Sequence, residues 1–421
     1  MKILWLVNIP LPEASLLMDE KSSPYGGWLF NASSHLVAQE DVELTVIFPK
    51  KGVTQSIRLK GDKITYYASK ILRDHDKKKI SENTIFKEII NEVNPDLVHI
   101  YGTELVHSLA MVNVCNNENI RSLISIQGIV SIIEKHVYAN LPYRIIYGFT
   151  LRNLLKMDNV IGLKKLFIKR GRAEIEAIQK VDHIIGRTTW DRACTSQINP
   201  KAEYHFCNET LREEFYNHEW NIEKCEKHSI FLSQGQYPIK GLHYMLEAMP
   251  LILQKYPQAK IYISGKDITK SGSLKDKLLM TYYGYYIKKM ISKNNLQHNI
   301  VFTGPLDEKQ ICNRYLKSNV FVCPSSIENS PNSLGEAMIL GVPCVASNVG
   351  GVPDMLKHKE EGFVYQADAP YMLAHYVCEI FESEKLAVSM SIKAREQALK
   401  THDRLQNTTR LTEIYKRILE A

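Results

Sequence analysis

The chain has 421 residues, of which 44% are hydrophobic and 24% are charged, and its formal net charge is +7. This length is enough for two domains with separate cores, and the composition excludes a disordered or fibrous protein. The apolar start MKILWLVNIPLP is short and lacks a small-residue cleavage site, so it predicts a first strand and not a signal peptide. No run approaches the ~18 apolar residues of a membrane-spanning helix, so we expect a cytoplasmic protein.

The cysteine pattern and the net positive charge limit the kinds of ligand and partner that we expect the protein to bind. Eight cysteines are scattered without a C-x-x-C pair, which indicates reduced, mostly buried thiols and no metal-ligand spacing. A net positive charge suits phosphorylated ligands, a membrane surface or nucleic acid. No helix-turn-helix, zinc-finger or RNP-like motif accompanies the charge, so we do not expect nucleic acid as a partner.

Short apolar runs alternate with helix-length segments along the whole chain. In the first half the runs KILWLV, VELTVIF, DLVHIY and SLISI predict strands, with helices over about 82–93 and 104–114. The pattern restarts after the polar stretch at 216–228, where SIFLSQ, AKIYISG, NIVFTG, NVFVCP and VPCVAS predict further strands. Such alternation predicts parallel sheets that are covered by helices on both faces.

A well-marked helix follows the restart of the pattern. Apolar residues recur with helical spacing at Leu242, Met245, Leu246, Met249 and Leu253, and this spacing predicts one apolar helix face. We therefore predict an α/β protein with two successive Rossmann-like units and a polar hinge near residue 220. In such units the ligand binds at the carboxyl ends of the parallel strands.

The stretch PSSIENSPNSLGEAMILGVPCVASNVGGVPD, residues 324–354, holds two carboxylates eight positions apart, Glu328 and Glu336. A carboxylate accepts two charge-assisted hydrogen bonds from neighbouring hydroxyls of a sugar or a ribose. The loop also leads into a helix N-terminus, whose free N–H groups and dipole favour phosphate. Hydroxyl and phosphate groups recognised at one site predict a nucleotide-sugar ligand.

This stretch resembles the donor-site signature of retaining GT-B glycosyltransferases, the glycosyl transferases group 1 family. That family carries two glutamates spaced E-x7-E, followed by A-M-x-x-G-x-P-V-V-A-S, and EAMILGVPCVAS at 336–347 matches it closely. The resemblance extends over the C-terminal half and more loosely over the N-terminal half. It implies the GT-B fold, in which two Rossmann-like domains face each other across a cleft.

The same resemblance implies a division into domains. We expect an acceptor-side domain over residues 1–218 and a domain that binds the nucleotide-sugar donor over residues 219–402. A last helical stretch covers about 386–419, and its end, from about 403 to 421, is expected to pack back on the first domain.

The resemblance also assigns roles in the donor site. Glu336 would bind the ribose hydroxyls of the nucleotide, and Glu328 would bind hydroxyls of the transferred sugar. The turn between them would offer backbone N–H groups to phosphate or sugar oxygens, from Ser330, Asn332, Ser333 and Leu334.

Lys240 lies in SQGQYPIKGL, which resembles the family's G-R-L-x-x-x-K-G turn between a strand and a helix. A fixed cation at this point stabilises the negative charge that develops on the departing diphosphate. The family places an arginine five residues earlier, where this chain has Gly235 followed by Gln236. The second cation is therefore missing or comes from elsewhere. The nucleotide base is expected to contact backbone atoms near Gly304 to Leu306.

The N-terminal half offers fewer matches to the family. Gly26 and Gly27 follow the first strand, where glycines let the backbone approach a diphosphate and a helix from Trp28 directs its N-terminus at it. The segment NPDLVHIYGTE resembles the family's D-V-V-H-x-H-x and would place His99 and Glu104 on the acceptor side. A buried, structural His99 is the alternative.

Gln127 stands where many relatives have a histidine that contacts the donor sugar near the reacting carbon. An amide can hydrogen-bond but cannot titrate, so an acid–base role at this position is excluded. The resemblance implies transfer with retention of configuration, without a cofactor or a metal, by positioning and electrostatics. The triplet Asp74–His75–Asp76 lies in the charged stretch RDHDKKK and predicts a solvated loop, not a metal site.

Two basic stretches are compatible with binding to a membrane surface. Residues 142–180 carry nine Lys or Arg against three Asp or Glu, interleaved with apolar residues, and residues 275–293 are rich in Tyr and Lys. Basic amphipathic helices of this kind lie on anionic membranes, but they also serve as helices packed on a sheet with their lysines in water. On the first interpretation the protein is peripheral on the inner face of the cell membrane.

Three functions remain open from the sequence. The first is a glycosyltransferase that uses a UDP- or GDP-sugar and a saccharide or lipid-linked saccharide acceptor, in bacterial surface polysaccharide assembly. The second is a nucleotide-sugar epimerase of the same fold. The third is a non-catalytic nucleotide-binding subunit, which the missing arginine and Gln127 favour. The presence of Glu328, Glu336 and Lys240 favours an enzyme.

Overall fold

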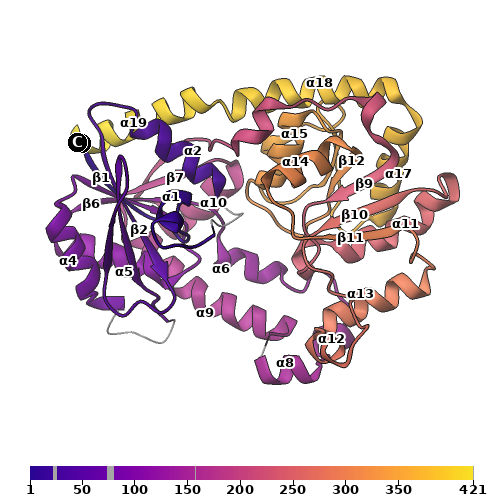
Figure 1. The fold of residues 1–421 in the computed structure, drawn as a ribbon, viewed down its shortest axis with the longest axis horizontal. Coiled ribbons are helices and arrows are strands. Elements are labelled where there is room, and N and C mark those ends of the chain that lie inside the picture. Colours follow the sequence, from indigo (N-terminus) through magenta and orange to yellow (C-terminus); the bar gives the residue numbers. More distant parts are fainter. Residues whose placement is uncertain (22–25, 74–79, 157, 421) are drawn as a thin grey trace. The chain divides into compact units, whose positions relative to one another are not determined.

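A computed structural model describes residues 1–21, 26–73, 80–156 and 158–420 (Figure 1). Its contacts divide the chain into two compact units. Unit 1 comprises Met1–Ile133, Phe167–Arg212 and Thr401–Ala421, and unit 2 comprises Glu134–Leu166 and Glu213–Lys400. The sequence predicted residues 134–166 as part of the first domain, whereas their contacts are with unit 2.

Unit 1 is built on an eight-stranded sheet with the order β3-β4-β2-β1-β5-β6-β7-β8. Every pair of neighbours is parallel except β3 and β4. The strands are β1 (Lys2–Leu6), β2 (Glu43–Lys50), β3 (Ile57–Lys60), β4 (Ile64–Lys70), β5 (Leu97–Tyr101), β6 (Arg121–Ser125), β7 (His183–Gly186) and β8 (Glu203–Phe206). The helices are α1 (Pro12–Leu16), α2 (Gly27–Leu36), α4 (Thr84–Val93), α5 (Val106–Asn117), α6 (Val130–Ile133), α10 (Thr189–Ile198) and α19 (Arg404–Glu420).

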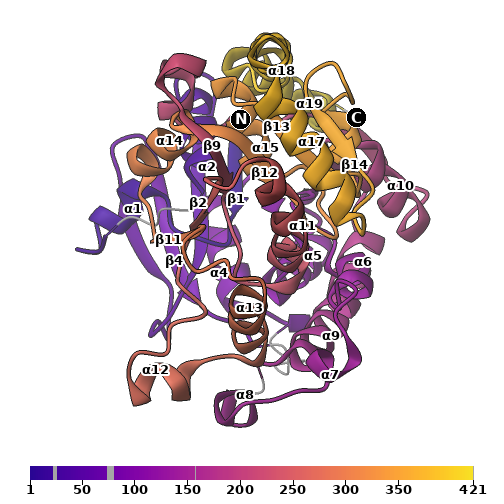
Figure 2. The ribbon, with the colours of Figure 1, turned by 90° about the vertical axis from the view of Figure 1, so that its right-hand side faces the viewer.

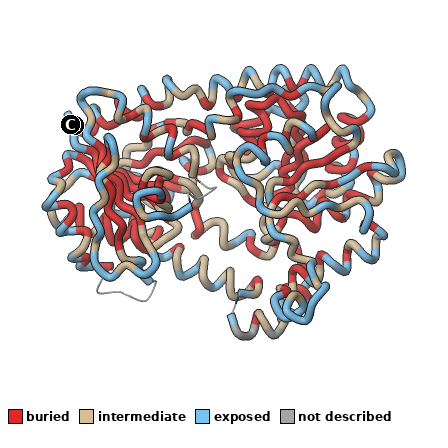
Figure 3. The backbone as a smooth tube through the Cα atoms, viewed as in Figure 1, coloured by how far each residue is buried: buried red, intermediate tan, exposed pale blue. Residues whose placement is uncertain are grey.

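Helices cover both faces of this sheet, because strand residues alternate between two apolar clusters. Leu4 and Leu6 pack with residues of α4 and α5, whereas Ile3 and Trp5 pack with residues of α2 and α19. Burial on both faces explains why β5, with the sequence LVHIY, is buried along its whole length. Figure 3 shows how much of the strand region of this unit is buried. The carboxyl ends of the central strands are thereby held at one edge of a rigid sheet.

Unit 2 is built on a six-stranded, fully parallel sheet with the order β11-β10-β9-β12-β13-β14. The strands are β9 (Glu226–Leu232), β10 (Lys260–Ser264), β11 (Ile300–Gly304), β12 (Ser318–Cys323), β13 (Cys344–Ser347) and β14 (Phe363–Tyr365). The helices are α7 (Tyr143–Ile146), α8 (Leu151–Lys156), α11 (Leu242–Lys255), α12 (Leu274–Leu279), α13 (Tyr282–Lys293), α14 (Glu308–Leu316), α15 (Asn332–Leu340), α16 (Val352–Met355), α17 (Pro370–Glu382) and α18 (Glu384–Thr401). Four short 3₁₀ helices are η1 (Glu134–His136), η2 (Glu213–Asn217), η3 (Ile222–Lys224) and η4 (Pro238–Lys240). Helix α9 (Val160–Gln179) contributes residues to both units.

The strand order places β9 between β10 and β12, so the loops that follow β9 and β12 lie at the same edge of the sheet. Helix α11 follows β9 and packs against α13 and α17, while α14 follows β11 and contacts α15. This is the doubly wound arrangement, in which ligands bind outside the carboxyl ends of the strands.

The last helical stretch is two helices and not one. Helix α18 ends at Thr401, and α19 begins after Asp403. The Asp403 carboxylate accepts a hydrogen bond from the backbone N–H of Gln406 at 2.7 Å, which is the geometry of a helix N-cap. Within the described ranges, no helix is long and apolar enough to cross a membrane.

Candidate functional site

Lys240 and Glu328 form an ion pair inside unit 2. Lys240 ends η4, in the loop between β9 and α11, and Glu328 lies on the loop between β12 and α15. The Lys240 ammonium donates to Glu328 Oε1 at 2.6 Å, and the Ser325 hydroxyl donates to the same oxygen at 2.7 Å. The two charged side chains are 26% and 12% exposed, so both can still reach a ligand in solvent.

The second oxygen of Glu328 is available to a ligand. Among the hydrogen bonds between described residues, none reaches Oε2 of Glu328, and Lys240 Nζ makes one of the three that an ammonium can donate. Burial opposes the charged form of Lys240, but the Glu328 carboxylate beside it outweighs this effect and raises the pKa of the ammonium. The lysine is therefore a fixed cation at neutral pH.

Close backbone contacts hold the two loops together. Gly241 has a φ of +71°, and a Cβ at this position would lie 1.8 Å from the carbonyl oxygen of Pro324. The backbone N–H of Ser326 donates to the carbonyl oxygen of Ile239 at 2.8 Å. Only a glycine fits at position 241, and this explains the K-G pair in the sequence. The ion pair is consequently held in place by the main chain on both sides.

The loop after β13 forms a third wall around Glu328. The backbone N–H of Gly351 donates to the carbonyl oxygen of Glu328 at 3.1 Å. Gly350 has a φ of +50°, and a Cβ there would lie 1.8 Å from that same oxygen. The Ser347 hydroxyl donates to the carbonyl oxygen of Ser325 at 2.5 Å. These groups were not among the predicted site residues, although two glycines after a strand are a recognisable sign of close backbone approach.

Glu336 lies on helix α15, whose first turn follows Pro331. Its side chain is buried, and α15 begins without a side-chain cap or an acidic residue in its first turn. Ser330 and Asn332 flank the start of the helix, and the backbone carbonyl of Ser333 accepts a hydrogen bond from Tyr315 at 2.9 Å. The structure thus brings Glu328, the N-terminus of α15 and Glu336 onto one continuous loop and helix.

Leu334 does not fit the role of a backbone donor to the ligand. Its N–H donates to the carbonyl oxygen of Pro331 at 2.9 Å, and its side chain is fully buried. Leu334 is a core residue in the first turn of α15. The sequence pattern did not separate it from the turn before it because the helix begins two residues earlier, at Asn332.

The position of the missing arginine is closed by packing. Gly235 is buried, and a Cβ there would lie 2.9 Å from Leu242 Cδ2 and 3.0 Å from Ile263 Cγ2. Gln236 extends its amide towards Gly265, which has a φ of +100° and donates its N–H to Gly304 at 2.9 Å. An arginine at 235 would therefore need a different packing of this turn. Leu306 is half-buried in the loop between β11 and α14.

In unit 1 the start of helix α2 is crowded by side chains. Gly26 has a φ of +80°, and a Cβ there would lie 2.2 Å from Ile9 Cδ1. A Cβ on Gly27 would lie 2.6 Å from Cγ of Arg212. The helix begins at Gly27, one residue earlier than the sequence indicated. The two glycines allow this N-terminus to lie close to neighbouring chain segments.

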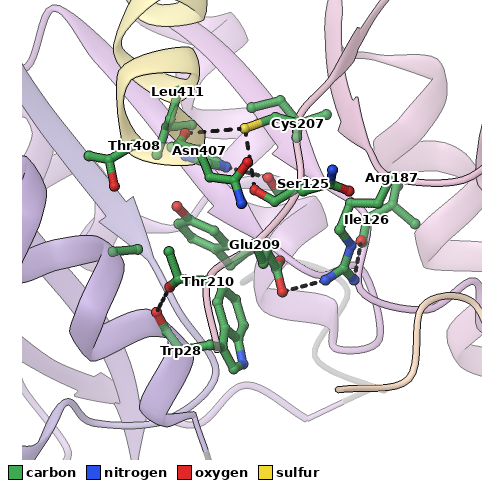
Figure 4. Close-up of a pocket in the computed structure, with 15 residues that line it drawn as sticks. Trp28, Ser125, Ile126, Arg187, Cys207, Glu209, Thr210, Asn407, Thr408 and Leu411 are labelled. Atoms are coloured by element: carbon green, nitrogen blue, oxygen red, sulfur yellow. Dashed lines mark hydrogen bonds and ion pairs between the residues drawn. The ribbon is translucent and has the colours of Figure 1, made fainter. Parts of the chain in front are cut away.

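Gln127 takes part in a buried polar network in unit 1. Its amide donates to Glu209 Oε1. The Arg187 guanidinium forms an ion pair with Glu209 Oε2, as Figure 4 shows. The Glu209 carbonyl accepts a hydrogen bond from His402 Nδ1 at 2.8 Å. Arg187 and Glu209 line a cavity of ≈ 30 Å³ together with Trp28 and other residues of unit 1, which is room for about two water molecules.

This network assigns Gln127 a structural contact that the sequence did not predict. Arg187 and Glu209 were not among the predicted residues. Arg187 lies on the loop after β7 and Glu209 on the loop after the edge strand β8, and no sequence pattern marks either residue. The cavity is too small for a sugar. The pair instead holds the loops that follow β6, β7 and β8 against one another.

His99 is a buried structural residue, the alternative noted from the sequence. Its Nδ1 lies 2.5 Å from the Tyr415 hydroxyl, and its Nε2 lies 2.7 Å from the Ser125 hydroxyl. Trp5 Nε1 donates to the same Tyr415 hydroxyl at 3.0 Å. Burial lowers the pKa of His99 well below its usual value, so the ring is neutral and ties helix α19 to strand β5.

Glu104 lies just after β5 beside a second carboxylate. Glu174 is buried and accepts hydrogen bonds from the Thr103 hydroxyl at 2.6 Å and from the Ser131 N–H at 2.8 Å. Burial, with the charge of Glu174 adding to it, raises the pKa of Glu104 to about 7. Asn8 Nδ2 is 3.4 Å from Glu104 Oε2. Glu104 can therefore exchange a proton near neutral pH, at the carboxyl edge of the unit 1 sheet.

The triplet Asp74–His75–Asp76 lies outside the described residues. Among the residues that the structure does describe, one cluster has metal-ligand spacing, namely His183, Glu203 and His205 on β7 and β8. Arg417 forms an ion pair with Glu203, and this cation weakens the cluster as a metal site.

Residues 214–397 match the model of the family described as Glycosyl transferases group 1. The matched residues include Lys240, Glu328 and Glu336. Among curated proteins, the chain is 28% identical over 207 residues to the putative glycosyltransferase YtcC of Bacillus subtilis, which is 48% of each chain. It is 30% identical over 141 residues to the uncharacterized glycosyltransferase MJ1607 of Methanocaldococcus jannaschii, which is 34% of this chain and 32% of that protein. The chain therefore spans less than half the length of these relatives.

Solved structures match the chain over its whole length. A sucrose-phosphate synthase from Thermosynechococcus elongatus superposes with a TM-score of 0.72 at 14% identity, covering 100% of this chain and 99% of that one. HepE of Anabaena, in complex with UDP and glucose, superposes with a TM-score of 0.66 at 13% identity, covering 99% of both chains. At such identities the likeness shows the fold. The predicted fold class is confirmed: the chain has the GT-B fold of two Rossmann-like domains, and residues 214–397 match the group 1 glycosyltransferase family.

Proposed function

We propose that this protein is a glycosyltransferase that moves a hexose-type sugar from a UDP- or GDP-sugar to a hydroxyl acceptor with retention of configuration. The observation that carries the proposal is the pairing of Lys240 with Glu328 at 2.6 Å, on a loop that continues into Glu336. These three residues supply a cation and two carboxylates within the segment that matches the family model. A nucleotide-sugar presents a diphosphate, which suits the cation, and two sets of hydroxyls, which suit the two carboxylates.

Each side chain has a distinct part in this proposal. Glu336 binds the ribose hydroxyls, and Oε2 of Glu328 accepts hydrogen bonds from hydroxyls of the transferred sugar. The backbone N–H groups at the start of α15 and the Lys240 ammonium contact the diphosphate. The ion pair with Glu328 fixes the position of the Lys240 ammonium, and its remaining N–H groups contact the diphosphate in this proposal.

In the chemical step the bond between the anomeric carbon and the phosphate oxygen breaks, and the electron pair stays on the nucleoside diphosphate. Lys240 stabilises this developing charge without a metal ion. The acceptor oxygen bonds to the anomeric carbon on the same face, and its proton passes to the departing phosphate. The protein therefore contributes mainly position and charge.

The identity of donor and acceptor follows from analogy. Two of the solved neighbours, HepE and TarM of S. aureus, are described in complexes with UDP, which favours UDP over GDP in the proposal. WaaG, another neighbour, is described as involved in lipopolysaccharide biosynthesis. We therefore propose a saccharide or lipid-linked saccharide acceptor in bacterial surface polysaccharide assembly.

Calorimetric titration with UDP and GDP tests the donor site. We expect the wild-type protein to bind one of them, and Glu336→Ala to weaken that binding at least about tenfold, because a charge-assisted bidentate contact is lost. Asp368→Ala, which removes a carboxylate from another loop of unit 2, is the matched control. Equal affinity of wild type and Glu336→Ala would show that the donor site is assigned wrongly.

A further inference from the structure

A surface of unit 2 is formed by residues 143–156, 158 and 266–293, and we call it the α8–α12–α13 face (Figure 1, Figure 2). The two segments are held together by hydrogen bonds. The Thr150 hydroxyl donates to the carbonyl oxygen of Met280 at 2.9 Å, and Arg152 donates to that of Leu279 at 2.6 Å. The face is therefore one structural feature and not two separate loops.

Large apolar side chains project from this face into solvent. Tyr143 is 81% exposed and Leu274 is 79% exposed, and more than half of the side-chain surface of Tyr147, Phe149 and Leu278 is also exposed. Isolated exposed apolar residues are common, but a group of them over two packed segments marks a surface that contacts another apolar phase. Their exposure removes nothing from the core of unit 2, because Ile145, Ile146 and Met280 between them are buried.

The same face carries a positive charge equal to that of the whole protein. It contains ten Lys or Arg against three Asp, a net charge of +7, and the formal net charge of the 421 residues is also +7. The three carboxylates are already engaged: Asp158 with Arg152, Asp267 with Thr269, and Asp276 in the capping box of α12. The rest of the chain carries equal numbers of basic and acidic residues, so the net positive charge of the protein is concentrated on this face.

Part of the charge surrounds a cavity of ≈ 650 Å³ within unit 2. Its lining includes Lys277, Lys288 and Lys289, together with Phe149, Tyr282 and Tyr285. Lys289 lies 4.7 Å from the centre of the Tyr285 ring, and Lys288 donates to the Ser271 hydroxyl. Within the described chain no carboxylate pairs with Lys277, Lys288 or Lys289. Unpaired lysines and hydroxyls in a hollow are suited to phosphate.

We propose that the α8–α12–α13 face docks onto the surface of an anionic phospholipid bilayer. The lysines of the cavity bind phosphate headgroups, while Tyr143, Tyr147, Leu274 and Leu278 insert at the level where headgroups meet acyl chains. Basic residues interleaved with exposed aromatic and aliphatic residues are complementary to this interface. A soluble anion would satisfy the lysines but would leave the apolar side chains in water. This inference goes beyond the proposed function, and its test requires no sugar transfer.

Sedimentation of the full-length protein with lipid vesicles tests the proposal. We expect binding to vesicles that mix phosphatidylcholine with phosphatidylglycerol, weak binding to phosphatidylcholine alone, and weaker binding as salt is raised. Equal binding to neutral and mixed vesicles, or none to either, would overturn the proposal. Soluble glycerol phosphate is a further arm: if it binds and no vesicle does, the cavity takes a soluble anion instead.

Charge variants locate the surface. Each lysine near an anionic membrane contributes about fivefold to binding, so Lys277→Gln/Lys288→Gln/Lys289→Gln should weaken vesicle binding by roughly 100-fold. Lys255→Gln/Lys260→Gln/Lys393→Gln removes the same charge from exposed positions of unit 2 outside the face. An equal loss in both triple variants would show that only net charge matters and would overturn the placement.

Apolar variants test insertion. Leu274→Ser/Leu278→Ser should weaken binding to mixed vesicles at least about tenfold and should do so at high salt as well, because apolar contact is not screened. Leu405→Ser, at an exposed leucine of unit 1, is the control. The thermal midpoint should not change, since these side chains are exposed. Unchanged vesicle binding by the double variant would mean that nothing inserts.

Discussion

Lys240 and Glu328 are 88 positions apart in the chain, yet their charged atoms are 2.6 Å apart. They meet because β9 and β12 are neighbours in the unit 2 sheet, so the loops that follow both strands share one edge. Ser325 adds a second hydrogen bond to the same carboxylate oxygen. A cation is thus fixed beside a carboxylate that has one oxygen left for a ligand, and the proposed chemistry rests on this arrangement.

Replacement of Lys240 by methionine should abolish most of the activity. The variant keeps the aliphatic stem but removes the cation that we expect to stabilise the departing diphosphate, and loss of one such group typically costs about 10² to 10³ in kcat. Release of nucleoside diphosphate measures the effect. Lys255→Met, at an exposed lysine of α11, should keep the wild-type rate, and so would Lys240→Met if the lysine has no part in the reaction.

Glu328→Gln should separate binding of the sugar from binding of the nucleotide. The amide keeps the size of the side chain but loses the charge that attracts sugar hydroxyls and Lys240. We expect the variant to bind free nucleoside diphosphate within about threefold of wild type, while kcat falls by about 10². Calorimetry and initial rates give the two values. A large loss of nucleotide affinity would show that Glu328 contacts the nucleotide and not the sugar.

Gly350→Ala should disturb the site without touching any charged group. A Cβ at Gly350 would lie 1.8 Å from the carbonyl oxygen of Glu328, and the residue has a φ of +50°. We expect a loss of about 1–3 kcal/mol in the free energy of unfolding and a fall in activity. Gly52 has a φ of +86°, and a Cβ there would meet nothing within 4 Å. Gly52→Ala is therefore a control for backbone strain alone. Equal behaviour of the two variants would contradict the close contact.

The strands were predictable where apolar runs are buried on both faces. KILWLV and LVHIY lie in the middle of the unit 1 sheet and carry a continuous apolar signal. The edge strands β3 and β8 gave no such signal, because IRLK and EYHF mix polar and apolar residues and are partly exposed. The break between α18 and α19 was missed because the sequence T-H-D-R-L-Q sits inside a continuous helical pattern, although Asp403 with Gln406 is an N-cap signature.

The proposed donor residues form a recognisable motif in the sequence, but the contacts that hold them in place do not. Lys240, Glu328 and Glu336 have recognisable spacing, whereas Ser325 and Gly350 act through contacts between segments that only the fold brings together. Gln127 shows the reverse case. Its position was predicted from the resemblance, but its partner Glu209 is 82 positions away and lies on a loop without a pattern.

Tyr415→Phe should destabilise unit 1. The Tyr415 hydroxyl accepts a hydrogen bond from Trp5 and contacts His99 Nδ1, and all three side chains are buried. Removal of the hydroxyl leaves two buried polar groups without a partner, so we expect a loss of about 2 kcal/mol in the free energy of unfolding. Urea denaturation measures it. Tyr371→Phe, at an exposed tyrosine, should change stability by less than about 0.5 kcal/mol; a similar effect of both would contradict the network.

The contribution of His243 and His402 to stability should fall as the pH is lowered below about 6.5. Burial lowers the pKa of His243 and of His402 to about 4, whereas an unfolded histidine titrates near 6.5. Between these values His243 and His402 bind more protons in the unfolded chain than in the folded chain, so each contributes up to about 3 kcal/mol of stability that is lost as the pH falls. His402→Gln should make the slope between pH 6.5 and pH 4 shallower. An unchanged slope in urea denaturation would contradict a neutral, buried His402.

Release of nucleoside diphosphate from UDP- and GDP-sugars, with and without acceptors that include a bacterial lipid extract, is the decisive test of sugar transfer. We predict release from one donor, dependent on an acceptor, with a glycoside product that keeps the configuration of the donor. Turnover of the nucleotide-sugar without any acceptor would indicate an epimerase. Absence of release from every donor by a protein that binds the nucleotide, with all acceptors tried, would contradict sugar transfer and favour a non-catalytic subunit.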